Sequence, residues 1–183
     1  ADAFRAIQTD SASAPVAAYR EAILAARPRS ARALQAQTIV RGWDGTLAID
    51  SAAAAITEAW LMRMADRTFR DKLGDALYAD YQGGRWLVRA LTLLLARPSD
   101  PWFTALADGE GRGRDELAAR ALDDATKDLT GRLGTDMATW RWGSLHTITF
   151  EHQLSVAKPL NLLFDIGPLP RPGDGYSVNQ AAY

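Results

Sequence analysis

The stretch SAAAAITEAWLMRMADRTFRDKLG, residues 51–74, carries the clearest helical pattern in the chain. Ser51 is a residue type that caps helix N-termini well. Apolar and charged residues then recur on opposite faces at helical spacing. The apolar face holds Ala53, Ile56, Trp60, Met64 and Leu73, and the charged face holds Glu58, Arg63, Asp66, Arg70 and Asp71. We predict an amphipathic helix over residues 51–74 that packs on a core.

Helical patterns lie on both sides of this segment. Pro15 opens an Ala-rich helix that Pro28 closes, and a second helix is expected over residues 30–42. A turn at residues 43–46 follows, with Gly45 at a positive φ. Three more helices are predicted further along: a short one that ends at Gly83-Gly84, one over residues 86–96 that is apolar nearly all round and should be buried, and one over residues 114–133 that is capped by Gly134.

The pattern changes after Trp140. Residues 145–150 alternate as in a strand, and we expect antiparallel strand over residues 145–154. Residues 166–175 contain three Pro and three Gly, so we expect irregular structure there, and Tyr176 could start a last strand. The predicted fold class is mainly α with a small antiparallel β portion near the C-terminus. We divide the chain into a helical portion, residues 1–139, and a strand and Pro/Gly-rich returning segment, residues 140–183.

Composition excludes several classes of protein. The 183 residues carry 21 Lys and Arg against 22 Asp and Glu, which argues against a general nucleic-acid binder. The chain has no Cys, which excludes disulfides, zinc–thiolate sites and cysteine nucleophiles. No run reaches the ~18 apolar residues of a membrane helix. Residues 1–8 have no signal-peptide core, so a signal for export would lie outside this chain.

Two histidines, His146 and His152, would share one face of a continued strand, because their separation is even. A metal site would need a third ligand such as Asp136 or Glu151, and Glu151 would point to the other face. We favour a buried histidine that packs beside Trp142 and bonds to the backbone.

Two loops suggest further sites. The run from Gly109 to Gly113 is similar to a phosphate loop, but no strand precedes it, and we favour a solvated loop. Asp174 could ligate calcium, yet one carboxylate falls short of the about six to eight oxygens that calcium takes. We favour a tight turn at Asp174.

No catalytic constellation stands out. Ser11, Ser13, Ser51 and Ser144 lack the Gly-x-Ser-x-Gly context of a nucleophile elbow. The paired carboxylates at 115–116 and 123–124 fit a solvated helix surface. Three tryptophans could line an aromatic pocket, although core positions are commoner: Trp102, Trp140 and Trp142. We assign no catalytic, cofactor-binding or metal-ligating residue.

Several motifs nevertheless occur in a fixed order. They are Phe4-Arg5-x-Ile7-Gln8-x-Asp10-x-x-Ser13, Trp43-Asp44-Gly45, Ser51-Ala52-Ala53-Ala54-Ala55-Ile56-x-x-Ala59-Trp60, Trp140-x-Trp142-Gly143-x-x-His146-x-x-x-Phe150-x-His152 and Gly167-Pro168-x-Pro170-x-Pro172-Gly173-Asp174-Gly175-x-Ser177-Val178-Asn179. Over essentially the whole chain, they resemble the later part of the beta chain of penicillin acylases. The resemblance is nearer to the aculeacin-type and acyl-homoserine-lactone acylase branch than to classical penicillin G acylase.

This resemblance implies an N-terminal-nucleophile hydrolase with a four-layer αββα fold, whose precursor cleaves itself into alpha and beta chains. A Ser at the beta-chain N-terminus attacks an amide carbonyl, and its own α-amine, with a pKa of about 7.7–8.0, acts as the base. An Asn side chain and a backbone amide stabilise the oxyanion. The resemblance also implies a periplasmic or secreted enzyme of antibiotic metabolism that uses no cofactor. Its partners would be the alpha chain and the remainder of the beta chain, with neither nucleic acid nor membrane.

None of those catalytic residues maps onto this sequence. Residue 1 is Ala rather than Ser, and Asn161 and Asn179 lack the context of the oxyanion asparagine. We therefore expect an inactive scaffold fragment of an amidohydrolase that acts on N-acylated small molecules, of the beta-lactam or acyl-homoserine-lactone type. The alternative is an autonomous helical binding module without catalysis, built on the apolar helix at 86–96 and the six tryptophans.

Overall fold

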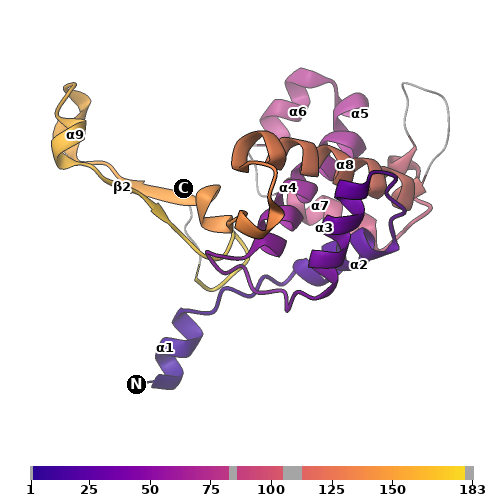
Figure 1. Cartoon of the computed structure of the whole chain (residues 1–183). Coiled ribbons are helices and arrows are strands. Elements are labelled where there is room, and N and C mark those ends of the chain that lie inside the picture. The colour runs from indigo at the N-terminus through magenta and orange to yellow at the C-terminus, as the bar shows by residue number, and fades with distance from the viewer. Residues whose placement is uncertain (1, 83–85, 105–112, 180–183) are drawn as a thin grey trace.

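The computed structural model describes residues 2–82, 86–104 and 113–179, and helices dominate these residues. The helices are α1 (Asp2–Gln8), α2 (Val16–Ala25), α3 (Ala31–Arg41), α4 (Ala52–Ala65), α5 (Asp71–Leu73), α6 (Asp75–Gln82), α7 (Trp86–Leu95), α8 (Gly113–Leu133) and α9 (Asn161–Phe164), and the strands are β1 (Thr147–Phe150) and β2 (Ile166–Pro170). Helices α2 to α8 form one body, and α1 and the hairpin that carries β1, β2 and α9 extend away from it (Figure 1).

Helix α4 lies at the centre of the body and confirms the helix predicted from Ser51. The Ser51 side chain caps it by accepting a hydrogen bond from the Ala54 N–H at 3.1 Å. Ile56, Trp60 and Met64 on its apolar face are fully buried. The helix passes through a π-helical turn at Asp66–Arg70 before α5, a feature that the sequence pattern did not predict.

The core forms where α4 packs against α2, α3, α7 and α8. The Trp60 indole N–H donates to the Ala118 carbonyl of α8 at 3.0 Å, which satisfies its polar atom inside the core. The Gln37 side-chain amide of α3 bonds the Ile23 and Ala26 carbonyls at 2.8 and 2.9 Å, so it holds the end of α2. Helix α8 buries the predicted face: Leu117, Ala121, Ala125 and Leu129.

Helix α7 differs from the prediction of burial on all sides. Leu87, Leu91 and Leu94 are buried, whereas Trp86 and Leu93 on the other side are 68% and 59% exposed. Composition alone could not reveal this, because an apolar residue is not obliged to be inside.

The β structure is a hairpin whose second strand was expected to be irregular. Strand β1 confirms that a strand lies within the predicted residues 145–154. It is shorter than predicted, because it covers only Thr147–Phe150. Strand β2 pairs with it antiparallel, with Thr147 opposite Pro170 and Ile148 opposite Leu169. Prolines are tolerated in β2 because it has a free edge where an N–H is not needed. The last strand predicted from Tyr176 is not found among the described residues, since 175–179 form a turn and bends.

Among the described residues, no helix combines the length and apolar character that crossing a membrane requires.

Candidate functional site

The motifs singled out in the sequence converge at one place. Segments 10–13, 43–47, 142–146 and 171–179 contact one another beside the N-terminal end of α4, and we call this place the junction. Its residues come from both ends of the described chain and from its middle. The junction is therefore the first place to look for chemistry.

Trp142 and His146 form the aromatic part of the junction. Their rings stack at 4.8 Å between centroids, with planes 17° apart. The Trp142 indole N–H donates to the Gly173 carbonyl at 3.0 Å, and Nδ1 of His146 lies 3.0 Å from the Arg171 carbonyl. This confirms the predicted packing beside Trp142 and the bond to the backbone, but His146 is half-buried rather than buried.

Asp174 forms the polar part of the junction. Its carboxylate accepts hydrogen bonds from the Ser13 hydroxyl at 2.6 Å and from the Tyr176 N–H at 2.8 Å. The Ser177 hydroxyl lies 3.0 Å from the same carboxylate and 3.3 Å from the Ser11 carbonyl. The predicted tight turn at Asp174 is confirmed, and the turn fastens the C-terminal segment to the segment before α2.

Two titratable side chains from the body face this carboxylate. Burial, and then the charge of Asp174, raises the pKa of the Glu58 carboxyl from 4.5 to about 8. Glu58 Oε1 is closed off from solvent and has no hydrogen-bond partner among the described residues. Burial also raises the pKa of Tyr19, whose hydroxyl lies 3.1 Å from the Thr92 hydroxyl. Both groups are thus neutral at pH 7.

The junction has the geometry of a structural clasp. Covalent catalysis requires a nucleophile within hydrogen-bond reach of a base, and the base is in turn oriented by a third group. The Ser13 hydroxyl instead donates directly to a carboxylate that other donors already occupy. His146 uses Nδ1 on the backbone.

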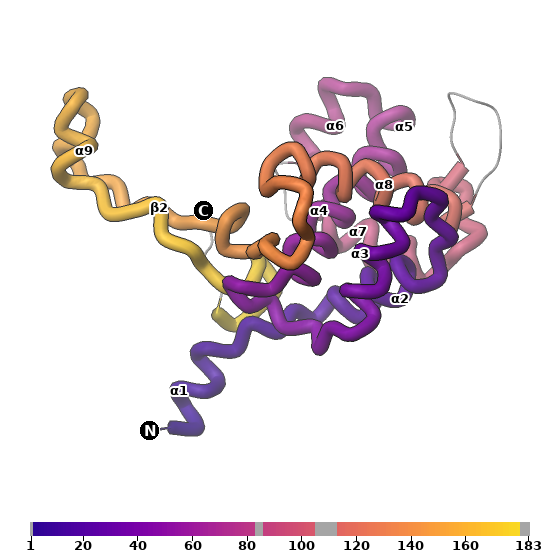
Figure 2. Tube along the Cα trace, in the orientation of Figure 1, coloured from indigo at the N-terminus to yellow at the C-terminus, as the bar shows by residue number. Residues whose placement is uncertain are grey.

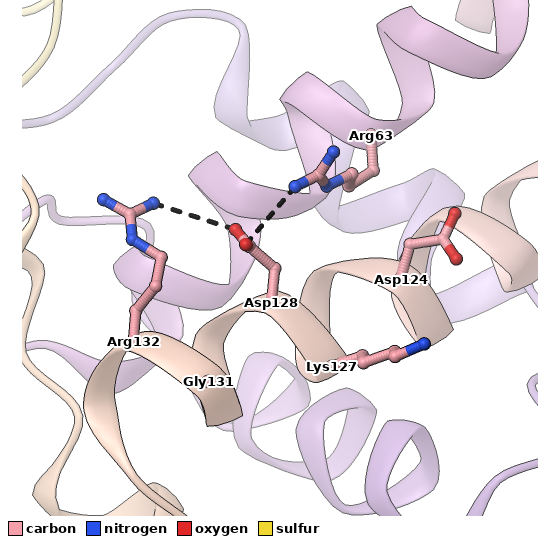
Figure 3. Close-up of a pocket in the computed structure, with 6 residues that line it drawn as sticks. All are labelled: Arg63, Asp124, Lys127, Asp128, Gly131 and Arg132. Atoms are coloured by element: carbon pink, nitrogen blue, oxygen red, sulfur yellow. Dashed lines mark ion pairs between the residues drawn. The ribbon is translucent and has the colours of Figure 1, made fainter.

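A charged pocket of about 530 Å³ lies between α4 and α8 (Figure 3). Asp128 points between Arg63 and Arg132, with N–O separations of 3.4 and 3.7 Å. Asp124 pairs with Arg67, which lies outside the pocket lining. Arginines engage both carboxylates of the lining, so the pocket is an ion-paired surface.

A second pocket, of about 460 Å³, lies between the π-helical turn, α6 and α7 and is almost wholly apolar. Phe69 and Trp102 form one wall, with ring centroids 5.4 Å apart. Its remaining lining is Leu73, Leu77, Tyr81, Ala90, Leu93, Leu94 and Arg97. The pocket can hold an apolar group but offers no nucleophile.

The other candidates of the sequence analysis are dispersed. The strand ends at Phe150, so His152 does not share a strand face with His146. His152 instead caps the short helical turn at Gln153–Val156, where its side chain accepts a hydrogen bond from the Leu154 N–H. Trp140 lies in the main core, and Trp142 lies in a separate cluster with Leu47 and Ala54. Together with Trp102 in the apolar pocket, the three tryptophans thus occupy three places.

The charged and glycine candidates lie on α8 and before it. The carboxylates at 115–116 and 123–124 lie on α8 and are engaged by arginines and by Ser30. The glycine run lies outside the described residues except Gly113, the first residue of α8. Among the described residues, no group of three or more potential ligands could hold a metal ion.

Glu58 is the site residue that the sequence analysis placed wrongly. The helical pattern put it on the charged, outward face of α4, but its Oε1 is buried. The charge of Asp174, more than a hundred residues away in sequence, also acts on Glu58, and no local pattern could reveal this environment.

The chain belongs to the penicillin amidase family, whose family model matches residues 1–183. Among its relatives is the acyl-homoserine lactone acylase QuiP of Pseudomonas fluorescens, 30% identical over 158 residues. That alignment covers 84% of this chain and 19% of the relative. The acyl-homoserine lactone acylase QuiP of Pseudomonas aeruginosa is 27% identical over 174 residues, which cover 83% of this chain and 20% of the relative. The chain thus spans about a fifth of the length of the curated relatives it matches.

Proposed function

We propose that this chain is a scaffold portion of an acylase that hydrolyses the amide bond of N-acylated small molecules. The observation that carries the proposal is the family match over residues 1–183, together with relatives named for acyl-homoserine lactones. The substrate class we infer is an N-acyl-homoserine lactone or a related acyl amide. We infer that the reacting serine and the oxyanion asparagine lie outside this chain, because no catalytic group of the family maps onto its motifs.

The geometry of the junction supports a scaffolding role. The motifs that resemble penicillin acylases meet there in hydrogen bonds to backbone and side chains. Side chains held in these hydrogen bonds fix the path of the chain rather than act as nucleophiles. The isolated chain is accordingly inactive, and the division at residue 140 separates the helical scaffold from a returning segment of the parent fold.

The wider assignment follows the same reasoning. We infer that the parent is an N-terminal-nucleophile hydrolase, exported to the periplasm or secreted, and that this chain lies in its beta subunit. Its partners are the alpha chain and the remainder of the beta chain.

Sequencing the N-terminus of the mature polypeptide that carries residues 1–183 tests the assignment. Expression of the complete open reading frame should yield a polypeptide that begins several hundred residues upstream with Ser. A mature, active polypeptide that begins within residues 1–183 would refute it.

A second candidate, an autonomous binding module, is favoured by the apolar pocket beside α7. Light scattering discriminates between the two candidates. A natural module stays monodisperse over a wide concentration range, whereas a scaffold portion that exposes former contact surface self-associates or binds a hydrophobic dye.

A further inference from the structure

The hairpin that leaves the body, residues 147–170, comprises β1, a short helical turn, α9 and β2, and we call it the arm. Figure 2 shows it running outward from the body as a separate projection. Ser155 is the only residue within 147–170 that is buried. Apart from its base, the arm therefore packs on little else among the residues that the structure describes.

The surface of the arm is apolar. Its exposed large hydrophobic residues are Phe150, Leu154, Val156, Leu162, Leu163, Phe164, Ile166 and Leu169. Val156, Leu162 and Leu163 at the far end are 90%, 80% and 77% exposed. Charged residues are few, and the Asp165 carboxylate is already engaged by the His152 N–H and the Ser155 hydroxyl. An arm with this many exposed apolar side chains and few charges has the composition of an interface.

The arm is nonetheless built onto the body at its base. Gly143 N–H donates to the Ile49 carbonyl at 2.8 Å, and Gly173 N–H donates to the Leu47 carbonyl at 2.9 Å. The stacked rings of Trp142 and His146 lie beside these two bonds. An isolated two-stranded ribbon is marginally stable in water at best, so a ribbon presented in this way requires a partner.

The two edges of the ribbon differ in what they offer a partner. Arg171 N–H donates to the His146 carbonyl at 2.9 Å, so residues alternate from that pair and the nitrogen of Pro170 faces away from β1. The register shifts between Ile148 and Phe150, so this alternation holds on β2 only as far as Leu169. Proline has no N–H, so Pro168 and Pro170 leave β2 poor in donors, which disfavours strand addition to its outer edge. On β1, the same alternation turns the backbone of Thr149 to the outer edge.

We propose that the remainder of the acylase polypeptide covers the arm, packing on its apolar tip and adding a strand to the outer edge of β1. The inference rests on the proposed function. The occupant follows from length, because this chain spans 19–20% of its relatives and four fifths of each relative lies outside the match. An apolar surface with few charges suits a permanent interface within one enzyme rather than a transient encounter.

The test expresses residues 1–183 and the rest of their open reading frame as two polypeptides, with a tag on the second. The wild-type chain should be captured. Val156→Lys with Leu163→Lys should weaken capture by about ten-fold or more, because charges replace buried apolar contacts. Leu34→Lys, on α3 and 47% exposed, is the matched control and should leave capture unchanged.

A second pair of variants tests the edge. Thr149→Pro removes an outward donor of β1 and should weaken capture, whereas Pro170→Ala on β2 should not. Circular dichroism of each variant checks that the body stays folded.

The outcomes separate the two proposals. Failure to capture the wild-type chain, or equal capture of all variants, overturns the inference about the arm. Uniform weakening that includes Leu34→Lys also overturns it. Arm-dependent capture in a complex that cleaves no acyl amide supports the inference and overturns the proposed function.

Discussion

Asp174 holds together segments that are far apart in sequence. Its carboxylate and the Ser13 hydroxyl, 2.6 Å apart, link residues separated by 161 positions. A short hydrogen bond to an ionised group is among the stronger polar interactions in proteins. The clasp at the junction should therefore contribute measurably to stability.

Ser13→Ala should lower the free energy of unfolding by about 1–2 kcal/mol, because it removes this charge-assisted bond from a partly buried carboxylate. Urea denaturation followed by circular dichroism measures the change. Ser144→Ala, at an exposed position, is the control and should change stability by less than about 0.5 kcal/mol. Equal effects of the two substitutions would show that the bond contributes nothing.

Glu58 should make stability depend on pH. Its pKa is raised in the folded protein from 4.5 to about 8, so between these values the folded state keeps a proton that the unfolded state loses. The stabilising contribution is complete below pH 4.5 and is lost as the pH rises toward about 8.

Glu58→Gln should therefore flatten the decline in unfolding free energy between about pH 5 and pH 8. At about pH 8 the variant should be more stable than the wild type by roughly 4 kcal/mol, because the amide cannot ionise and each unit of the shift from 4.5 to about 8 corresponds to about 1.4 kcal/mol. Urea denaturation across this pH range measures the difference in stability. Glu151→Gln, at an exposed position, is the control. An unchanged slope would contradict the buried, neutral state of Glu58.

Single residues differ in how far the sequence predicts them. Ser51 as an N-cap and Gly45 at φ 91° follow from local chemistry, and both are confirmed. The burial of Glu58 and the bond between Ser13 and Asp174 depend on long-range contact, which local patterns do not encode.

Among the elements, the helices of the body follow from periodicity. Helices α2, α3, α4 and α8 appear where the spacing of apolar residues predicts them. Strand β2 was not predicted, because its prolines and glycine are residue types that indicate a loop when no pairing partner is known. Its strand character comes from pairing with β1, and Pro170 is tolerated because its nitrogen faces outward.

Gly143 fixes the approach of the arm to the body. A Cβ at this position would lie 2.5 Å from Ile49 Cγ2 and 2.8 Å from Pro170 Cβ, so neighbouring groups would have to move. At Gly131 in α8, by contrast, an added Cβ would meet no described atom within 4 Å.

Gly143→Ala should destabilise the protein by about 1–3 kcal/mol through overpacking. Gly131→Ala should stabilise it by up to about 1 kcal/mol, because alanine favours a helix interior. Thermal denaturation of both variants gives the comparison. Stabilisation by both would mean that the base of the arm is loosely packed.

For the molecule as a whole, the order of the motifs carried more information than any single residue. The sequence motifs predicted the family, which the match over residues 1–183 confirms. They could not predict that residues from both ends would meet at one junction, or that the arm would leave the body. Both features depend on tertiary packing.

The molecule divides its apolar surface unevenly. The body buries Trp60 and Trp140 fully, although Trp86 on α7 is exposed, while the arm leaves most of its large apolar side chains exposed. This distribution agrees with the proposal that further polypeptide covers the arm.

The most direct measurement is hydrolysis of an N-acyl-homoserine lactone by two preparations, compared side by side. One is the purified 183-residue chain, and the other is the complete polypeptide from the same open reading frame. The complete polypeptide should release the free lactone amine, and the chain alone should add nothing to the uncatalysed rate. Saturable hydrolysis by the chain alone, retained after repurification, would contradict it.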